Sequence, residues 1–136
     1  MTQQVVLVTG DPGGIGRATA LHPAGLGYRV FATGHKPELL EAVQRDAGDL
    51  ALETFPLDVD DAASLAAAGA EVERRTEGRG LDVLVNNAGF GLTAPMKLID
   101  DADLRGQFVT NVFGLVRATQ QFAPAMRLRR ALEAPR

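Results

Sequence analysis

The chain has 136 residues, of which 46% are hydrophobic and 23% charged, with a formal net charge of −3. This length suits one core, so residues 1–136 are expected to form a single domain. Cysteine is absent, which excludes disulfides, thiolate nucleophiles and cysteine-ligated metals. The two histidines, His22 and His35, lie far apart in sequence, so no metal site is expected. Basic residues are scattered apart from a C-terminal cluster, which argues against a nucleic-acid partner.

The N-terminus gives no sign of export or membrane insertion. Met1-Thr2-Gln3-Gln4 lacks the basic residues of a signal peptide, and the apolar run behind it is too short for the hydrophobic part of one. No segment approaches the length of a transmembrane helix. We therefore expect a cytoplasmic protein with no membrane partner.

Short apolar runs alternate along the chain with segments of helical periodicity. The runs predict four strands, and the fourth is continuously apolar except for Asp82. Continuous apolar runs are typical of a parallel sheet that helices cover on both faces. The expected strands are residues 5–9, 29–33, 52–57 and 81–85.

The first expected helix runs from Gly14 to about Gly25. Pro23 falls inside it, lacks an N–H group, and brings its ring against the carbonyl four residues back. We therefore expect this helix to kink or stop near His22.

Two further helices follow the second and third strands. Pro37 suits a first helical position, and Gly48 is expected to close that helix. Asp60 or Asp61 can cap the next helix, which should end near Gly78.

The longest helix is expected after Asp100 or Asp101, either of which can cap it. Phe113 and Val116 lie off its main apolar stripe and could form a second apolar surface for pairing subunits. The main stripe advances in steps of three and four residues and consists of Leu104, Phe108, Val112, Leu115, Thr119, Phe122 and Met126.

Alternating strands and helices predict an α/β fold with a doubly wound parallel sheet of the Rossmann type. Right-handed crossovers give the strand order 3-2-1-4, with a ligand crevice beside strands 1 and 4. The sheet is expected to be truncated after about four strands.

A glycine-rich turn, Thr9-Gly10-Asp11-Pro12-Gly13-Gly14-Ile15-Gly16, joins the first strand to the first helix. Gly10 allows a tight turn, Gly14 lacks the Cβ that would block a pyrophosphate, and Gly16 lets helix and strand pack closely. Unpaired N–H groups at the start of a helix bind phosphate. The turn therefore predicts a phosphate cradle, unless it is a glycine-rich loop without a ligand.

Four motifs make the chain resemble the short-chain dehydrogenase/reductase family, specifically its N-terminal cofactor-binding portion. The resemblance extends from about Val5 to Arg130. It implies hydride transfer between a nicotinamide cofactor and a small-molecule carbonyl or alcohol substrate. The motifs are Thr9-Gly10-x-x-x-Gly14-Ile15-Gly16, Asp58-Val59, Asn86-Asn87-Ala88-Gly89 and Asn111.

The resemblance also implies roles for these residues. Asp58 would accept a hydrogen bond from the adenine amino group, unless it caps a helix. Residues 86–89 would lie against the cofactor ribose, with Thr9 bonded to them, although a purely structural role for Asn86 stays open. Asn111 would bend its helix and hold a water in the proton relay, unless it is a capping or surface amide. The cofactor-binding set is Thr9, Gly10, Gly13, Gly14, Ile15, Gly16, His35, Asp58, Val59, Asn86, Asn87, Ala88 and Gly89.

The end of the second strand bears on the choice of cofactor. NAD binding favours an acid there, to hold the ribose 2′-hydroxyl, but Gly34 occupies the position. Lys36 or a protonated His35 could attract the 2′-phosphate of NADP. The sequence therefore favours NADP, with NAD possible.

The family's catalytic serine and Tyr-x-x-x-Lys motif are not found. Tyr28 is the only tyrosine and has no lysine four residues later, and Ser64, the only serine, belongs to a predicted helix. The chain is expected to be inactive alone, with a fifth strand and the catalytic half following Arg136 in a complete enzyme. Alternatives are a non-catalytic dinucleotide-binding module and a decayed gene product. Asp11, placed near the expected pyrophosphate, favours these alternatives, as does Pro12.

A truncated sheet would leave its fourth strand as an apolar edge and the long helix without a neighbour. We therefore expect a homo-oligomer, or self-association through the helix at residues 101–128 and the sheet edge.

Overall fold

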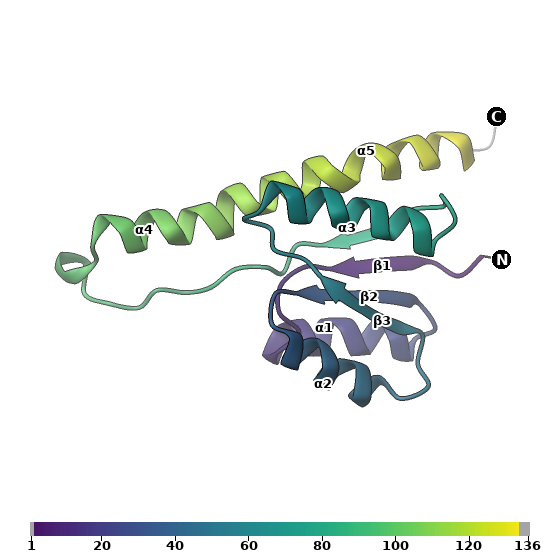
Figure 1. Cartoon of the computed structure of the whole chain (residues 1–136), viewed down its shortest axis with the longest axis horizontal. Helices are drawn as coiled ribbons and strands as arrows, with labels where there is room; N and C mark the ends of the chain where they lie inside the picture. The colour runs from purple at the N-terminus through teal and green to yellow at the C-terminus, as the bar shows by residue number, and fades with distance from the viewer. Residues whose placement is uncertain (1, 134–136) are drawn as a thin grey trace.

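A computed structural model describes residues 2–133, in which four parallel strands form one sheet (Figure 1). The order is β3-β2-β1-β4, which confirms the order expected from right-handed crossovers. The strands are β1 (Val5–Val8), β2 (Arg29–Gly34), β3 (Leu52–Pro56) and β4 (Val83–Val85).

Helices cover both faces of the sheet: α1 and α2 pack on one face, and α3 and α5 on the other (Figure 1). The helix labelled α4 projects past the sheet at the end of a long loop (Figure 1). None of the described helices is both long and apolar enough to cross a membrane. The helical segments are α1 (Gly14–Gly25), α2 (Pro37–Ala47), α3 (Ala62–Arg75), the 3-10 turn η1 (Met96–Leu98), α4 (Asp101–Phe108), the π-helical segment η2 (Val109–Gly114) and α5 (Leu115–Glu133).

The central strand β1 is buried on both faces. Val5 and Leu7 pack in the core cluster beneath α3 and α5, whereas Val6 and Val8 pack in the cluster beneath α1 and α2. Successive residues of a strand point to opposite faces, so a continuous apolar run is needed to fill both clusters.

Of the expected kink or stop near His22, the stop is wrong, because α1 continues through Pro23 to Gly25. Proline falls in the last turn, so it removes a single hydrogen bond close to the helix end. Its own carbonyl still accepts the N–H groups of Leu26 at 3.0 Å and Tyr28 at 3.1 Å, which closes the helix.

The fourth strand is shorter than expected, since β4 begins at Val83 and not at residue 81. The Asp82 carboxylate accepts the N–H of Val5 at 2.6 Å, while the Asp82 N–H donates to the Val5 carbonyl at 2.9 Å. A side chain thus replaces one backbone bond of the ladder where regular pairing ends.

The single long helix expected after residue 100 is divided into α4, η2 and α5. Asp100 caps α4 by accepting the Asp103 N–H at 2.8 Å, and Asp61 likewise caps α3. The predicted stripe is buried only in its C-terminal part, around Phe122. A π-helical turn carries an extra residue and shifts the buried face, and α4 extends beyond the sheet (Figure 1). Leu104, Phe108, Val112 and Leu115 are therefore exposed.

Candidate functional site

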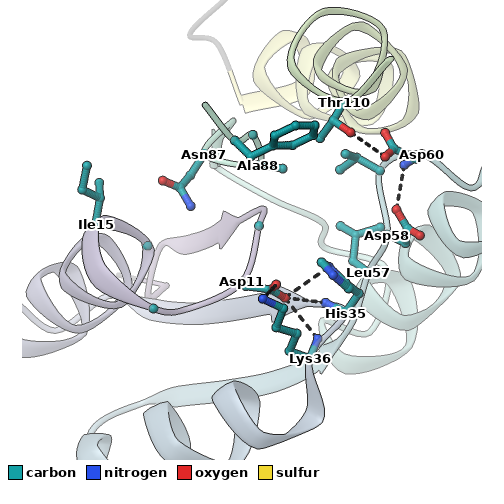
Figure 2. Close-up of a pocket in the computed structure, with 16 residues that line it drawn as sticks. Asp11, Ile15, His35, Lys36, Leu57, Asp58, Asp60, Asn87, Ala88 and Thr110 are labelled. Atoms are coloured by element: carbon teal, nitrogen blue, oxygen red, sulfur yellow. Dashed lines mark hydrogen bonds and ion pairs between the residues drawn. The ribbon is translucent and has the colours of Figure 1, made fainter. Parts of the chain in front are cut away.

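A crevice of about 680 Å³ opens at the carboxyl ends of the strands. Each strand leads into a segment that contributes to its wall, and η2 covers one side (Figure 2). The lining residues are Gly10, Asp11, Gly13, Ile15, Gly16, His35, Lys36, Leu57, Asp58, Val59, Asp60, Asn87, Ala88, Gly89, Phe90 and Thr110.

The glycine-rich turn between β1 and α1 is packed on one side and open on the other. A Cβ at Gly10, whose φ is +87°, would lie 2.6 Å from the Cα of Ala88. A Cβ at Gly16 would lie 2.7 Å from the Asp11 carbonyl oxygen. Gly14 has a φ of +52°, and a Cβ there would meet nothing within 4 Å. Gly10 and Gly16 thus permit tight packing of the turn, whereas the backbone at Gly14 faces open space.

Thr9 joins the ends of β1 and β4. Its hydroxyl accepts the N–H groups of Asn87 and Ala88, both at 3.1 Å, and the Asn87 side-chain amide donates to the Thr9 carbonyl at 3.0 Å. Thr9 is 1% exposed, so it shapes the crevice wall from behind and does not line it. A buried N–H group without a hydrogen-bond acceptor lowers the stability of the fold, which explains why a hydroxyl is placed at this position.

The two asparagines after β4 point in different directions. Asn87 lines the crevice, as Figure 2 shows. Asn86 is not among the lining residues, and its side-chain amide donates to the Thr119 hydroxyl on α5 at 3.1 Å. Asn86 therefore ties the sheet to a helix in this structure.

Asn111 sits in η2 behind the crevice wall. Its side-chain oxygen accepts the Phe90 N–H at 2.9 Å, and its side-chain NH₂ donates to the Phe90 carbonyl at 2.7 Å. A Cβ at Gly89 would approach that side-chain oxygen to 2.9 Å. Asn111 thus fixes the loop that follows β4, and its amide is fully engaged there.

Asp58 lines the crevice after β3 and does not cap α3, because Asp61 does so. One Asp58 carboxylate oxygen accepts the Asp60 N–H at 2.9 Å, and the Asp58 N–H donates to the Ser64 hydroxyl at 2.9 Å. Val59 is buried in the core while also lining the crevice. The segment is therefore rigid, with carboxylates facing the opening (Figure 2).

Asp11 does not lie where the sequence suggested. Its carboxylate is held at the end of β2, where one oxygen accepts the N–H groups of His35 at 2.7 Å and Lys36 at 3.1 Å (Figure 2). Glycine at position 34 leaves room for this carboxylate, because a Cβ there would lie 2.5 Å from that oxygen.

Sequence reasoning missed several lining residues. Thr110 donates from η2 to the Asp60 carboxylate at 2.6 Å, across fifty positions of sequence. No short motif connects two such residues, since only the path of the chain brings them together. Leu57 and Phe90, which also line the crevice, carry no signal in the sequence. Among the described residues, no cluster of His, Asp and Glu side chains could hold a metal ion.

Comparisons with known proteins agree with this geometry. Human 17-beta-hydroxysteroid dehydrogenase type 1 is 40% identical over 139 residues, covering 95% of this chain and 40% of that protein. A short-chain dehydrogenase from Streptomyces avermitilis superposes with a TM-score of 0.85 at 34% identity, covering 95% of this chain and 46% of the other. Actinorhodin polyketide ketoreductase gives a TM-score of 0.82 at 30% identity, with coverage of 96% and 49%.

The chain thus spans about half the length of the relatives it matches. A family model described as short chain dehydrogenase matches residues 4–131, which is nearly the whole chain. The match includes the glycine-rich turn, the segments after β3 and β4, and the η2 asparagine. This chain belongs to the short-chain dehydrogenase family.

Proposed function

We propose that this chain forms the cofactor-binding part of an NAD(P)-dependent oxidoreductase acting on a carbonyl or alcohol substrate. The observation that carries this proposal is the open backbone surface at the start of α1, where Gly13, Ile15 and Gly16 line the crevice and Gly14 between them carries no side chain. The first N–H groups of a helix lack partners within the helix and bind phosphate well. A pyrophosphate fits this surface, because the space that a Cβ at Gly14 would take is free.

Other lining residues suit the remainder of a dinucleotide. The Asp58 carboxylate is available to accept a hydrogen bond from an adenine amino group. Ile15 is 79% exposed, and its apolar side chain would be covered by a bound cofactor. The segment from Asn87 to Gly89 lies beside the glycine-rich turn and would border the ribose. Thr9 and Asn86 do not line the crevice, so they would support this surface indirectly.

We propose NADP as the preferred cofactor, with NAD as the alternative. Gly34 carries no carboxylate of its own, and His35 and Lys36 both line the crevice there, beside the Asp11 carboxylate. A cationic side chain beside helix N–H groups is a favourable site for phosphate. The actinorhodin ketoreductase structure is described with NADPH, which supports a phosphorylated dinucleotide in a related crevice.

The bound dinucleotide would exchange hydride with a substrate carbon. This half of the enzyme would contribute binding and orientation, with Asn111 supporting the proton relay by holding the loop at Phe90 in position. Tyr28 packs against the core cluster on the α1 side, and Ser64 is bonded to the Asp58 backbone. Neither residue lines the crevice, so neither is assigned the proton transfer to substrate.

A non-catalytic dinucleotide-binding module, or an inactive truncated paralogue, is the second candidate function. The positions of Tyr28 and Ser64, both engaged elsewhere, favour it for this chain. Turnover of NADPH by the purified chain with a panel of aldehydes and ketones would exclude the non-catalytic module. Binding without turnover is expected of both candidates, because neither Tyr28 nor Ser64 lines the crevice.

We also propose a cytoplasmic location and self-association of this chain, with neither nucleic acid nor membrane as a partner. The β4 edge is unpaired in the described sheet. Phe113 and Val116 add exposed apolar surface on the helix at residues 101–128. Exposed strand edges and apolar patches promote association between copies.

The proposed cradle is tested by calorimetric titration of NADPH into two glycine variants. Gly14→Ala adds a methyl group to the open surface at a left-handed φ, and we expect NADPH affinity to fall about tenfold or more, which is about 1.4 kcal/mol. Gly25→Ala is the matched control, because its Cβ meets nothing within 4 Å at the far end of the same helix. Equal affinity in both variants, or no binding by the folded parent chain, would overturn the proposal.

A further inference from the structure

Asp11 links the glycine-rich turn to the end of β2 through four polar contacts. One carboxylate oxygen accepts the backbone N–H groups of His35 at 2.7 Å and Lys36 at 3.1 Å. The same oxygen lies 3.3 Å from His35 Nδ1, and the other oxygen lies 3.8 Å from Lys36 Nζ. Figure 2 shows the three side chains converging on one wall of the crevice.

The position of this carboxylate is fixed by the absence of a side chain at Gly34. A Cβ at Gly34 would lie 2.5 Å from the nearer Asp11 oxygen and 2.8 Å from the Asp11 Cα. No residue larger than glycine fits there without displacing Asp11. The Asp11 carboxylate therefore occupies the space that a side chain at the end of β2 would otherwise fill.

The donors that Asp11 uses are those that a phosphate would need. Two backbone N–H groups precede the first turn of α2, and an imidazole and an ammonium group stand beside them. A phosphate at this point would seek the same hydrogen bonds and the same positive charge. It would also meet a carboxylate of like charge at close range.

We propose that Asp11 is a specificity-determining residue that competes with the cofactor 2′-phosphate at the end of β2. This inference rests on the proposed dinucleotide site. Asp11 weakens NADP binding because its negative charge lies beside the His35 and Lys36 side chains and its oxygen already accepts their backbone N–H groups. It does not weaken NAD binding in the same way, because a ribose 2′-hydroxyl can donate a hydrogen bond to the carboxylate. The ratio of NADPH to NADH affinity is therefore smaller than it would be if His35 and Lys36 were present without the Asp11 carboxylate.

The test compares NADPH and NADH affinities by calorimetry in two variants at position 11. Asp11→Ala removes both the charge and the acceptor, and we expect the ratio of NADPH to NADH affinity to rise about tenfold. Asp11→Asn removes the charge but keeps an acceptor for the N–H groups, so its ratio should lie between those of the parent and Asp11→Ala. The isosteric Asp11→Asn change also keeps the test informative if the alanine variant folds poorly.

Asp46→Asn is the matched control, because it removes one negative charge from the Arg17–Asp46 surface pair outside the crevice. Its affinity ratio should equal that of the parent chain. An unchanged ratio in both Asp11 variants, with both nucleotides bound, would overturn the inference and leave the proposed function standing. An equal rise in Asp46→Asn would also overturn it, because net charge would then explain the effect. If no folded variant binds either nucleotide, the proposed function fails and the inference fails with it.

Discussion

At the scale of single residues, the crevice depends on a buried hydroxyl as much as on glycines. Thr9 lies where the ends of β1 and β4 meet, and its hydroxyl accepts two successive N–H groups of the segment that follows β4. The family resemblance predicted a bond between Thr9 and the asparagine segment, and the structure contains three such bonds. What the sequence could not indicate is that Thr9 lies behind the wall, since burial depends on the strands on either side.

Thr9→Val should destabilise the fold by about 2 kcal/mol, because an isosteric side chain leaves the Ala88 N–H without its acceptor and the Asn87 N–H with the Val85 carbonyl alone. Urea denaturation of the two proteins measures this difference. Thr93→Val, in the exposed loop after β4, is the control and should change stability by less than about 0.5 kcal/mol. A similar small effect for Thr9→Val would show that water satisfies the two amides.

At the scale of elements, strands were easier to predict than the long helix. Apolar residues form the core of the strands, as in Val5–Val8 and Val83–Val85, so the strands were visible in sequence and only their ends shifted by one or two positions. The helix after residue 100 reads as one periodic segment, but η2 interrupts it at Asn111. Hydrophobic spacing does not reveal this π-helical turn, whereas the family resemblance implied a bend at Asn111, which lies within it.

Helix α3 carries the carboxylate with the clearest pKa shift in the described structure. Hydrogen bonds from Arg74 and then Arg75 lower the pKa of Glu71 from 4.5 to about 2. A carboxylate with a depressed folded-state pKa contributes stability above its unfolded value, and that contribution is lost as the pH falls toward the folded value.

We therefore expect the stability difference between the parent chain and Glu71→Gln to shrink between pH 4.5 and about pH 2. Thermal unfolding across this range measures the difference. Glu73→Gln, an exposed neighbour on α3 that forms no ion pair among the described residues, serves as the control and should give a flat difference. A flat profile for Glu71→Gln would refute the assigned pKa.

At the scale of the whole molecule, the described sheet is covered on both faces and open at its two edges, β3 and β4. The fold class, strand order and crevice position followed from the alternation of strands and helices, since handedness leaves few topologies. The wall opposite the glycine-rich turn could not be predicted, because residues such as Asp60 and Thr110 meet only in three dimensions. The open edge at β4 was expected, and its consequence for association is testable.

Val83→Lys should shift the chain toward monomer, because a lysine on an edge strand opposes pairing with a second strand. Val83 is 39% exposed on β4, so the charge can reach water without disturbing the core. Light scattering coupled to size-exclusion chromatography measures the mass of both proteins at the same concentration. Lys97→Ala, in the exposed turn η1, is the surface control. A monomeric parent chain would contradict self-association outright.

The central claim is that the crevice at the carboxyl ends of the strands binds a nicotinamide dinucleotide. Backbone amide NMR during an NADPH titration tests it most directly, because each segment of the wall reports separately. We expect saturable shifts at residues 10, 11 and 13–16, at His35 and Lys36, at residues 58–60 and at residues 87–90. Little change is expected in a second groove, between α1 and β4, whose lining includes Ala18, His22 and Val83. Unchanged spectra at millimolar NADPH, or shifts confined to that groove, would contradict the claim.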